Sequence, residues 1–210
     1  MSNNGQETEA KFYVLNLAEI EMHLQDLGAR LIQAQVLEAN VRFDLPDARL
    51  QSDRRVLRLR RDTEARLTYK SASTNEQGVL SRTEIEFIVE DFEKAKQFLE
   101  ALDYQPIFYY EKYRTTYILQ LSEGPVHVML DELPYGNFVE IEGETIESIR
   151  QVSGALHLKW NAAIGTSYSA LFKRVSQTLN LSFQDLSFEK FAGIQVSSAD
   201  LGVQVADEMT

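Results

Sequence analysis

The chain has 210 residues, the length of one ordinary domain, and its 44% hydrophobic residues are enough to bury a core. Its formal net charge of -11 argues against a protein that binds nucleic acid by neutralising phosphates over a broad surface. The absence of cysteine excludes disulfides and thiolate metal sites.

In chain order, alternating apolar and polar residues between turn signals predict eight strands, over residues 6–14, 35–45, 54–62, 65–73, 79–89, 106–121, 125–133 and 136–144. Apolar residues at helical spacing predict four helices, over 17–28, 91–102, 145–156 and 167–179. Many strands and few helices are typical of an α+β fold. We therefore expect a closed or nearly closed eight-stranded antiparallel β-barrel with helices packed on the outside.

We expect one domain over residues 1–179 and a C-terminal extension over 180–210. The periodic patterns weaken after about residue 180. Residues 182–191 have the character of a short helix, and residues 197–210 are small and acidic, as in a loose tail.

The sequence gives no indication of a membrane or of export. No run of 18 or more apolar residues is present, and the first twelve residues lack the basic and apolar segments of a signal peptide. Together with the absence of cysteine, this favours the cytoplasm. We expect neither a membrane nor a nucleic-acid polymer as a partner, and a monomer or a homodimer as the oligomeric state.

Charged residues recur at every second position of most predicted strands, with apolar or aromatic residues between them. Because side chains at i and i+2 share one face of a strand, each such strand has a charged face. The acidic members are Glu7, Glu9, Glu84, Glu86, Asp131, Glu140 and Glu142. The basic members are Lys11, Arg58, Arg60, Lys70, Arg82, Lys112 and Arg114.

Two interpretations of this pattern are open. For any one pair, such as Glu140 and Glu142, a solvated sheet face is the simpler one. Over seven strands it is less satisfactory, because like charges two residues apart lie about 6.6 Å from each other along a strand. At an effective dielectric constant of 20 they repel by about 2.5 kcal/mol. A closed interior in which acids face bases balances this repulsion, so we favour a barrel with a charged lumen.

The two kinds of charge predict different ligands. Clustered carboxylates attract hard cations such as Mg²⁺ or Mn²⁺. Clustered Arg and Lys side chains attract phosphate oxygens. Together they predict a site for a divalent metal and a polyphosphate, and an acidic protein can bind such a polyanion when its bases gather in one cleft.

The same residues carry a family resemblance. Glu7-Thr8-Glu9-Ala10-Lys11 matches the E-x-E-x-K signature of the CYTH superfamily, also called the triphosphate tunnel metalloenzymes. The order of later motifs makes the resemblance specific: Phe43-Asp44, Arg58-Leu59-Arg60, Lys70, Glu84-Ile85-Glu86, Lys112, Arg114, Asp131, Glu140-Ile141-Glu142 and Ser167-Tyr168. The chain resembles the family over about residues 6–176. This implies an eight-stranded tunnel, open at both ends, that binds a triphosphate at its middle.

The charge pattern and the resemblance together give candidate roles. The phosphate-binding candidates are Arg58, Arg60, Lys70, Arg82, Lys112 and Arg114, with Arg82 alternatively an ion-pair partner of Glu84. The metal-ligand candidates are Glu7, Glu9, Asp131, Glu140 and Glu142. Glu84 and Glu86 are expected to line and support the tunnel. Lys11 is the catalytic candidate: the resemblance implies a general base or a group that positions the nucleophile, and nearby carboxylates, which stabilise its protonated form, favour positioning.

Three functions are consistent with these residues. The first is hydrolysis of inorganic triphosphate, or a related small triphosphate, with Mg²⁺ or Mn²⁺. The second is a class IV adenylate cyclase that converts ATP to cyclic AMP and pyrophosphate, and the third is a non-catalytic polyphosphate- or nucleotide-binding module.

The resemblance limits the substrate to inorganic triphosphate, ATP or thiamine triphosphate. Two features of the sequence help to choose among these three. The segment Asn40-Val41-Arg42-Phe43-Asp44 lacks a second-strand tyrosine found in some thiamine triphosphatases, which disfavours the thiamine compound. Trp160 and the run Phe108-Tyr109-Tyr110 are interpreted as packing residues and not as a platform for adenine. We therefore favour the hydrolase over the cyclase.

Overall fold

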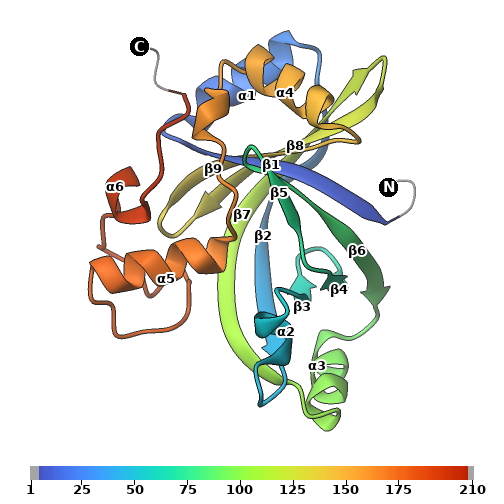
Figure 1. The fold of residues 1–210 in the computed structure, drawn as a ribbon, viewed down its shortest axis with the longest axis vertical. Helices are drawn as coiled ribbons and strands as arrows, with labels where there is room; N and C mark the ends of the chain where they lie inside the picture. Colours follow the sequence, from blue (N-terminus) through green and yellow to red (C-terminus); the bar gives the residue numbers. More distant parts are fainter. Residues whose placement is uncertain (1–4, 208–210) are drawn as a thin grey trace.

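One antiparallel sheet forms the body of the protein in the computed structural model, which describes residues 5–207 apart from the side chain of Gln6 (Figure 1). Its strands are β1 (Gln6–Val14), β2 (Arg30–Asp44), β3 (Val56–Arg61), β4 (Ala65–Lys70), β5 (Thr74–Glu76), β6 (Val79–Val89), β7 (Gln105–Leu121), β8 (Gly124–Leu133) and β9 (Gly136–Glu142). Eight of them close a ring in the order β1-β9-β8-β7-β2-β3-β4-β6, because β6 pairs again with β1. The expected α+β barrel is therefore confirmed.

The strand β2 departs most from the sequence prediction. It begins at Arg30 and not near residue 35. Its pairing with β7 shifts register between Leu31 and Gln33 and again between Gln33 and Val36. Such irregularities interrupt the period-2 pattern, so the sequence signal begins only where the register becomes regular.

The longer helices lie where the apolar spacing predicts them: α1 (Leu17–Asp26), α3 (Phe92–Ala101), α4 (Ile146–Ala155) and α5 (Tyr168–Thr178). Each begins after a residue whose side chain accepts a hydrogen bond from a backbone N–H in the first turn: Asn16, Asp91, Thr145 and Ser167. The short elements β5, α2 (Arg49–Ser52), the 3₁₀ helix η1 (Trp160–Ala162) and α6 (Ser198–Leu201) were not predicted, because three or four residues show no period. Among the described helices, none combines the length and the apolar character that crossing a bilayer requires.

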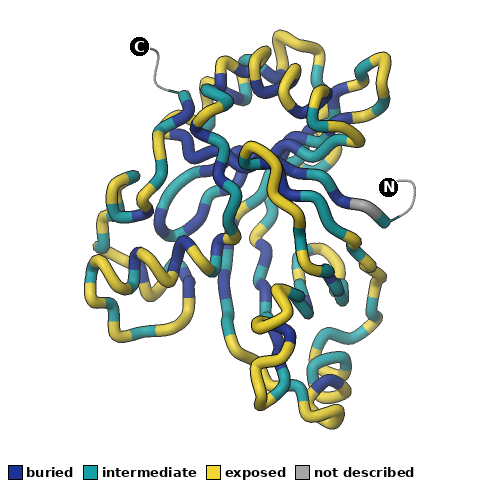
Figure 2. Tube along the Cα trace, in the orientation of Figure 1, coloured by how far each residue is buried: buried dark blue, intermediate teal, exposed yellow. Residues whose placement is uncertain are grey.

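The apolar core lies between the outer surface of the ring and the helices. α1 and α4 lie side by side over one end of the ring (Figure 1) and bury a cluster that includes Phe12, Ile20, Leu24, Val139 and Ile149. A second cluster lies under α5 and the chain that follows it, and it includes Tyr135, Phe138 and Leu171. Figure 2 shows the buried residues concentrated on the strands and on the inner sides of these helices. Because the apolar faces point outward to the helices, the charged faces point into the lumen.

The C-terminal extension packs against the ring, in contrast to the loose tail that its composition indicated. In place of a helix over 182–191, Leu186 forms a parallel bridge with Tyr110 and turns follow. Further on, Val205 bridges to Tyr13, and the carboxylate of Asp207 accepts hydrogen bonds from the backbone N–H of Leu15 at 2.9 Å. Residues 208–210 lie outside the described part. Scattered apolar side chains, too irregular to show a period, hold this segment in place.

This packing makes Leu186 important for stability. Its side chain is fully buried in the second cluster, so Leu186→Ala should lower the free energy of unfolding by about 3 kcal/mol through lost burial and a residual cavity. Urea unfolding measures the change. Leu31→Ala, at a side chain 47% exposed, is the matched control and should change stability by less than about 1 kcal/mol. Equal effects of the two variants would show that the extension does not stabilise the barrel.

Candidate active site

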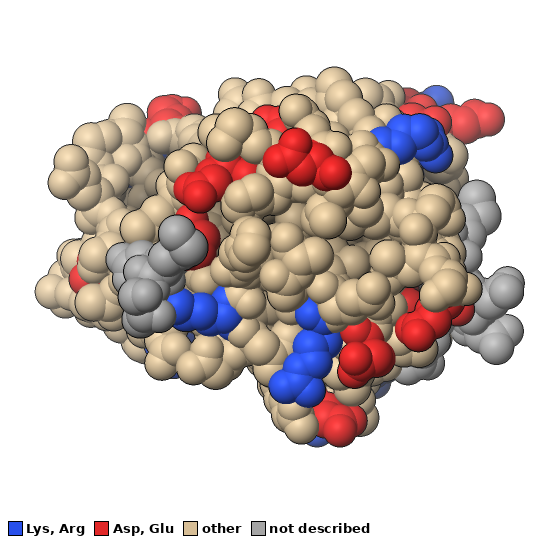
Figure 3. Space-filling model, turned by 90° about the horizontal axis from the view of Figure 1, so that it is seen from above, with Lys and Arg blue, Asp and Glu red and all other residues tan. Residues whose placement is uncertain are grey.

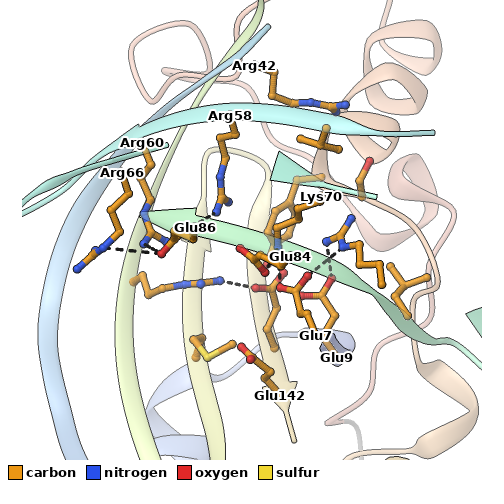
Figure 4. Close-up of a pocket in the computed structure, with 18 of the residues that line it drawn as sticks. Glu7, Glu9, Arg42, Arg58, Arg60, Arg66, Lys70, Glu84, Glu86 and Glu142 are labelled. Carbon is orange, nitrogen blue, oxygen red and sulfur yellow. Dashed lines mark hydrogen bonds and ion pairs between the residues drawn. The ribbon is translucent and has the colours of Figure 1, made fainter. Parts of the chain in front are cut away.

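Closing the ring brings the predicted charged residues together around one cavity. Its volume is about 770 Å³, and every candidate site residue except Asp131 lines it. Figure 4 shows Arg58 and Arg60 extending into this space, with Glu7, Glu9 and Glu142 on the other side, whereas Arg66 turns toward Glu86. By contrast, Lys and Arg side chains are sparse on the face of the molecule seen in Figure 3. Nine of the 21 Lys and Arg residues of this acidic protein line this one cavity.

A second cavity of about 420 Å³ adjoins the first. The two share Arg60, Arg114, Met129 and Glu142 in their walls, and the second continues past Glu38 and His127. The interior is therefore a passage with two chambers that meet at these four side chains.

The acids of β1 hold the bases of β4 and β6. Glu7 accepts from Lys70 Nζ at 2.6 Å and from Arg82 Nε at 2.9 Å, and Glu9 pairs with Arg82 at 3.3 Å. Burial alone would raise the pKa of Glu7, but the charges of Lys70 and Arg82 outweigh it and hold that pKa far below its usual value. Arg82 therefore pairs with Glu7 and Glu9, and not with Glu84 as one alternative had it.

Glu142 lies in the same region without a cationic partner. In the described part of the chain it has no ion pair and no hydrogen bond through its side chain. Burial, together with the like charges of Glu7 and Glu9, raises its pKa to about 7. Burial and the charge of Glu7 also raise the pKa of Glu84 to about 7, although Lys70 lies 3.1 Å from it. This end of the site therefore holds surplus negative charge.

Lys11 is buried within a cage of oxygen atoms and an aromatic ring. Its Nζ lies 3.1 Å from Glu140 Oε1, and 4.3 Å from the centre of the Tyr168 ring. Burial would lower the pKa of Lys11, but the charges of Glu140 and Glu9 overcome this and raise it. Lys11 is thus a fixed cation at neutral pH, which agrees with a positioning role and not with a general base.

Asp131 stands behind the cavity wall and holds three donors. Its carboxylate accepts from Lys112 Nζ at 3.0 Å, from Arg114 Nε at 2.6 Å and from the Tyr168 hydroxyl at 2.8 Å. The residue is 0% exposed. Its oxygens are therefore occupied by two bases and a hydroxyl, outside the cavity lining, and the metal-ligand role of Asp131 stays a prediction. Glu140 pairs with Arg114 as well as with Lys11.

The bases of β3 meet acids of neighbouring strands. Glu86 lies 3.5 Å from Arg58 and 3.3 Å from Arg60, which makes it a supporting residue between the two. Arg60 also lies 3.5 Å from Glu38 and 3.3 Å from Asp62.

Several lumen residues were missed by the sequence prediction: Glu38, Asn40, Arg42, Asp62, Arg66 and Tyr110. Three of them, Glu38, Asn40 and Arg42, alternate along β2 with Val41 and Phe43, so the rule that found the other strands applies here too. Glu38 is 2% exposed, and the charges of Lys112, Arg114 and Arg60 overcome the effect of burial and lower its pKa to about 2. The alternation of charged and apolar residues can therefore be seen in the sequence of β2. It is weaker there than on the other strands, since only two of these three residues are charged.

The donor set fits a hard divalent cation by its chemistry. Glu7, Glu9, Glu84 and Glu142 provide carboxylate oxygens, and the raised pKa of Glu142 and of Glu84 shows unbalanced negative charge that a cation would neutralise. Among residues 5–207, however, no three His, Cys, Asp or Glu side chains converge as a ready set of ligands. Glu7, Glu9 and Glu84 instead point at Lys and Arg, whereas Glu142 has no such partner among the described residues. Binding a metal would therefore require some of these ion pairs to exchange.

Comparisons with known proteins agree with the ring and its lumen. The CYTH domain matches residues 5–161. Solved structures of similar fold include a Vibrio parahaemolyticus protein provisionally assigned as an adenylate cyclase, with 20% identity, a TM-score of 0.69, and coverage of 80% of this chain and 99% of that one. A Pyrococcus horikoshii protein has 25% identity, a TM-score of 0.62, and coverage of 77% and 96%. A Hippeastrum protein, provisionally an adenylyl cyclase and described as having a dominant triphosphatase activity, has 19% identity, a TM-score of 0.61, and coverage of 80% and 95%.

No curated protein matches the chain. The closed antiparallel ring with charged residues inside nevertheless defines a triphosphate tunnel fold. The chain belongs to the CYTH domain family, whose members include triphosphatases and class IV adenylate cyclases.

The raised pKa of Glu142 predicts a stability that depends on pH. The folded state holds this proton more tightly than the unfolded state, whose pKa is near 4.5, so folding loses stability as pH rises from about 4.5 through 7. Glu142→Gln removes this loss. Without divalent cations, it should raise the free energy of unfolding by about 2 kcal/mol at pH 8, with the difference shrinking toward pH 4.5. Denaturant titrations at several pH values measure it, and a difference that is constant with pH would contradict the assignment.

Proposed function

We propose that this protein hydrolyses inorganic triphosphate or a related small triphosphate with the help of Mg²⁺ or Mn²⁺. The observation that carries the proposal is the divided lumen. Arg58 and Arg60 lie across one cavity from the surplus carboxylates around Glu142, and Lys112 and Arg114 line the same cavity. A chain of phosphates that bears a divalent cation complements both sides at once.

The bases serve as the phosphate clamp. Arg58 and Arg60 on β3 and Arg114 on β7 offer planar forks that bind two phosphate oxygens each, whereas Lys70 and Lys112 act as point charges. Each base is now held by a carboxylate, so its position is fixed before substrate arrives. Phosphate oxygens would take over some of these contacts, and the carboxylates released would become available to a metal ion.

The metal-ligand candidates are Glu142, Glu7 and Glu9, with Glu140 beside them. A bound divalent cation would neutralise phosphate charge and lower the pKa of a coordinated water. Glu140 and Asp131 hold Arg114 and Lys11 in this proposal, and Glu84 and Glu86 hold Lys70, Arg58 and Arg60.

The reaction is attack of water on a terminal phosphorus. A bond forms between the water oxygen and that phosphorus, and the bond from phosphorus to the bridging oxygen breaks. The electron pair leaves with pyrophosphate, the other product is orthophosphate, and the proton of the water is released to solvent. Lys11, charged and held by Glu140, orients the reacting phosphate, and the arginines stabilise its charge in the transition state.

A class IV adenylate cyclase is the second candidate. Phe87 and Ile88 expose apolar surface where they line the cavity, which could receive an adenine ring. The aromatic residues that the sequence offered are occupied, since Trp160 packs on Phe12, and Phe108 stacks on Tyr110. A fixed platform for adenine is therefore not evident in the described residues, and the hydrolase remains the better-supported function.

The products separate these candidates. Incubation with Mg²⁺ or Mn²⁺ and inorganic triphosphate should yield orthophosphate and pyrophosphate in equal amounts, resolved by ion-exchange chromatography. The same incubation with ATP tests the cyclase, for which cyclic AMP is the diagnostic product. Cyclic AMP without triphosphate hydrolysis would overturn the proposal, and binding without either reaction would indicate a binding module.

The metal assignment predicts opposite effects of one substitution on stability and activity. Glu142→Gln, expected above to stabilise the protein at pH 8, should raise the Mg²⁺ concentration for half-maximal hydrolysis at least about tenfold, because a charged ligand is lost. Glu90→Gln, at an exposed position beyond the end of β6, is the matched control and should leave the titration unchanged. An unaltered Mg²⁺ requirement in Glu142→Gln would remove Glu142 from the metal site.

A further inference from the structure

One cation in the main cavity differs from all the others. Within residues 5–207, eight of the nine Lys and Arg side chains that line the cavity have a carboxylate within 4.0 Å, namely Lys11, Arg58, Arg60, Arg66, Lys70, Arg82, Lys112 and Arg114. The ninth, Arg42, has none. Its Nη1 donates to the hydroxyl of Ser169, and its buried Nε has no partner.

An unpaired guanidinium in this place is unfavourable. Burial, and the neighbouring charges of Arg58 and Arg82, lower the pKa of Arg42. The nearest acid along the strand, Asp44, is already used, because its carboxylate accepts from the backbone N–H groups of Leu50 and Gln51. Arg42 is half-buried. A cation that is partly removed from water and has no ion-pair partner lowers stability, so the position of Arg42 indicates an anion that comes from outside the chain.

The surroundings of Arg42 are rich in donors. Ser167, Tyr168 and Ser169, the start of α5, line the same cavity, and the first N–H groups of this 11-residue helix lack helical acceptors. The hydroxyls of Ser167 and Ser169 lie 3.0 Å apart. Arginine, hydroxyls and a helix N-terminus together make a place suited to phosphate oxygens.

A second observation on β2 is independent of the helix. Asn40 precedes Arg42 on the inward face of this strand and is 0% exposed. Both its amide nitrogen and its amide oxygen are buried and have no hydrogen-bond partner. Buried amides are almost always satisfied, so this one leaves a second unsatisfied polar group on the inward face of β2, behind the residues that line the cavity.

Arg42 lies just beyond the proposed clamp. It is the cross-strand neighbour of Arg58, and in Figure 4 its side chain turns away from Arg58, Arg60 and Arg66. A triphosphate held by the clamp would leave Arg42 without a partner. A chain with one further phosphate at this end would bring an anion to it.

We propose that Arg42 and the first turn of α5 form a subsite for an additional phosphate, which makes linear inorganic polyphosphates of four or more phosphates the favoured substrates. This inference rests on the proposed function, because the subsite extends the same clamp.

The test compares kcat/KM for inorganic triphosphate and inorganic tetraphosphate with Mg²⁺. The wild-type protein should prefer the tetraphosphate, and Arg42→Gln should lower the ratio of tetraphosphate to triphosphate at least about fivefold, mainly through KM. Arg42→Lys should recover part of the ratio, and Arg30→Gln, at an exposed arginine of the same strand, should not change it. Arg42→Gln should also raise the melting temperature of the free protein, whereas a purely structural arginine would lower it.

Two outcomes would overturn the subsite: an equal loss for both substrates, which would place Arg42 in the triphosphate clamp, or no loss for either. Calorimetry with tetraphosphate and triphosphate in EDTA separates this inference from the proposed function. A preference for tetraphosphate that depends on Arg42, in a protein that hydrolyses neither compound, would sustain the subsite and refute the hydrolase. Hydrolysis of triphosphate by a protein whose binding of tetraphosphate over triphosphate does not depend on Arg42 would sustain the hydrolase and refute the subsite.

Discussion

The mutual pairing of charges inside the ring is the interaction on which the rest of this structure depends. Single ions buried without partners would destabilise the fold, so the lumen is stable only because acids and bases alternate around it. Asp131 illustrates this, since one fully buried carboxylate holds Lys112, Arg114 and Tyr168. Glu86 likewise forms ion pairs with both Arg58 and Arg60. These pairs set the positions of the side chains that we propose to bind phosphate.

The same constraint explains where the apolar residues lie. A strand with one charged face turned inward must bury its other face on the outside, and the helices α1, α4 and α5 cover that surface. The C-terminal extension completes the cover, with Leu186 and Val205 adding short bridges to β7 and β1. Part of the outer face of β6 remains uncovered, and Ile85 is more than half exposed there. The barrel is thus stabilised from its outside and charged at its centre.

The balance of charge fails at two places, and both lie in the main cavity. Within residues 5–207, neither Glu142 nor Arg42 forms an ion pair, so negative charge is in excess at the first and positive charge at the second. A metal ion would correct the first imbalance and a phosphate the second. A ligand that contains both a metal ion and phosphate groups would stabilise the folded protein. Unbalanced charge of this kind lowers stability, and folded proteins tolerate it mainly at functional sites.

Much of the fold followed from periodicity alone, because a closed barrel repeats one local rule on every strand. The alternation of Arg58, Leu59 and Arg60, for example, fixed which side chains share a face. The alternation of charged and apolar residues was less informative on β2, where register shifts and the uncharged Asn40 obscured it. The extension after residue 180 escaped prediction because its contacts, such as Leu186 with Tyr110, join segments far apart in the sequence and leave no period.

The sequence by itself determined that seven acids and seven bases line one face of the strands and that the chain closes into a barrel of the CYTH family. Only the tertiary structure decided how those charges pair. It placed Asp131 behind the wall among three donors and left Glu142 close to other carboxylates. It also left Arg42 beside Ser169, with no described carboxylate close enough for an ion pair. The physical reason is that alternation sets the face of a side chain, whereas the partner across the lumen depends on strand order, register and the angle at which the ring closes.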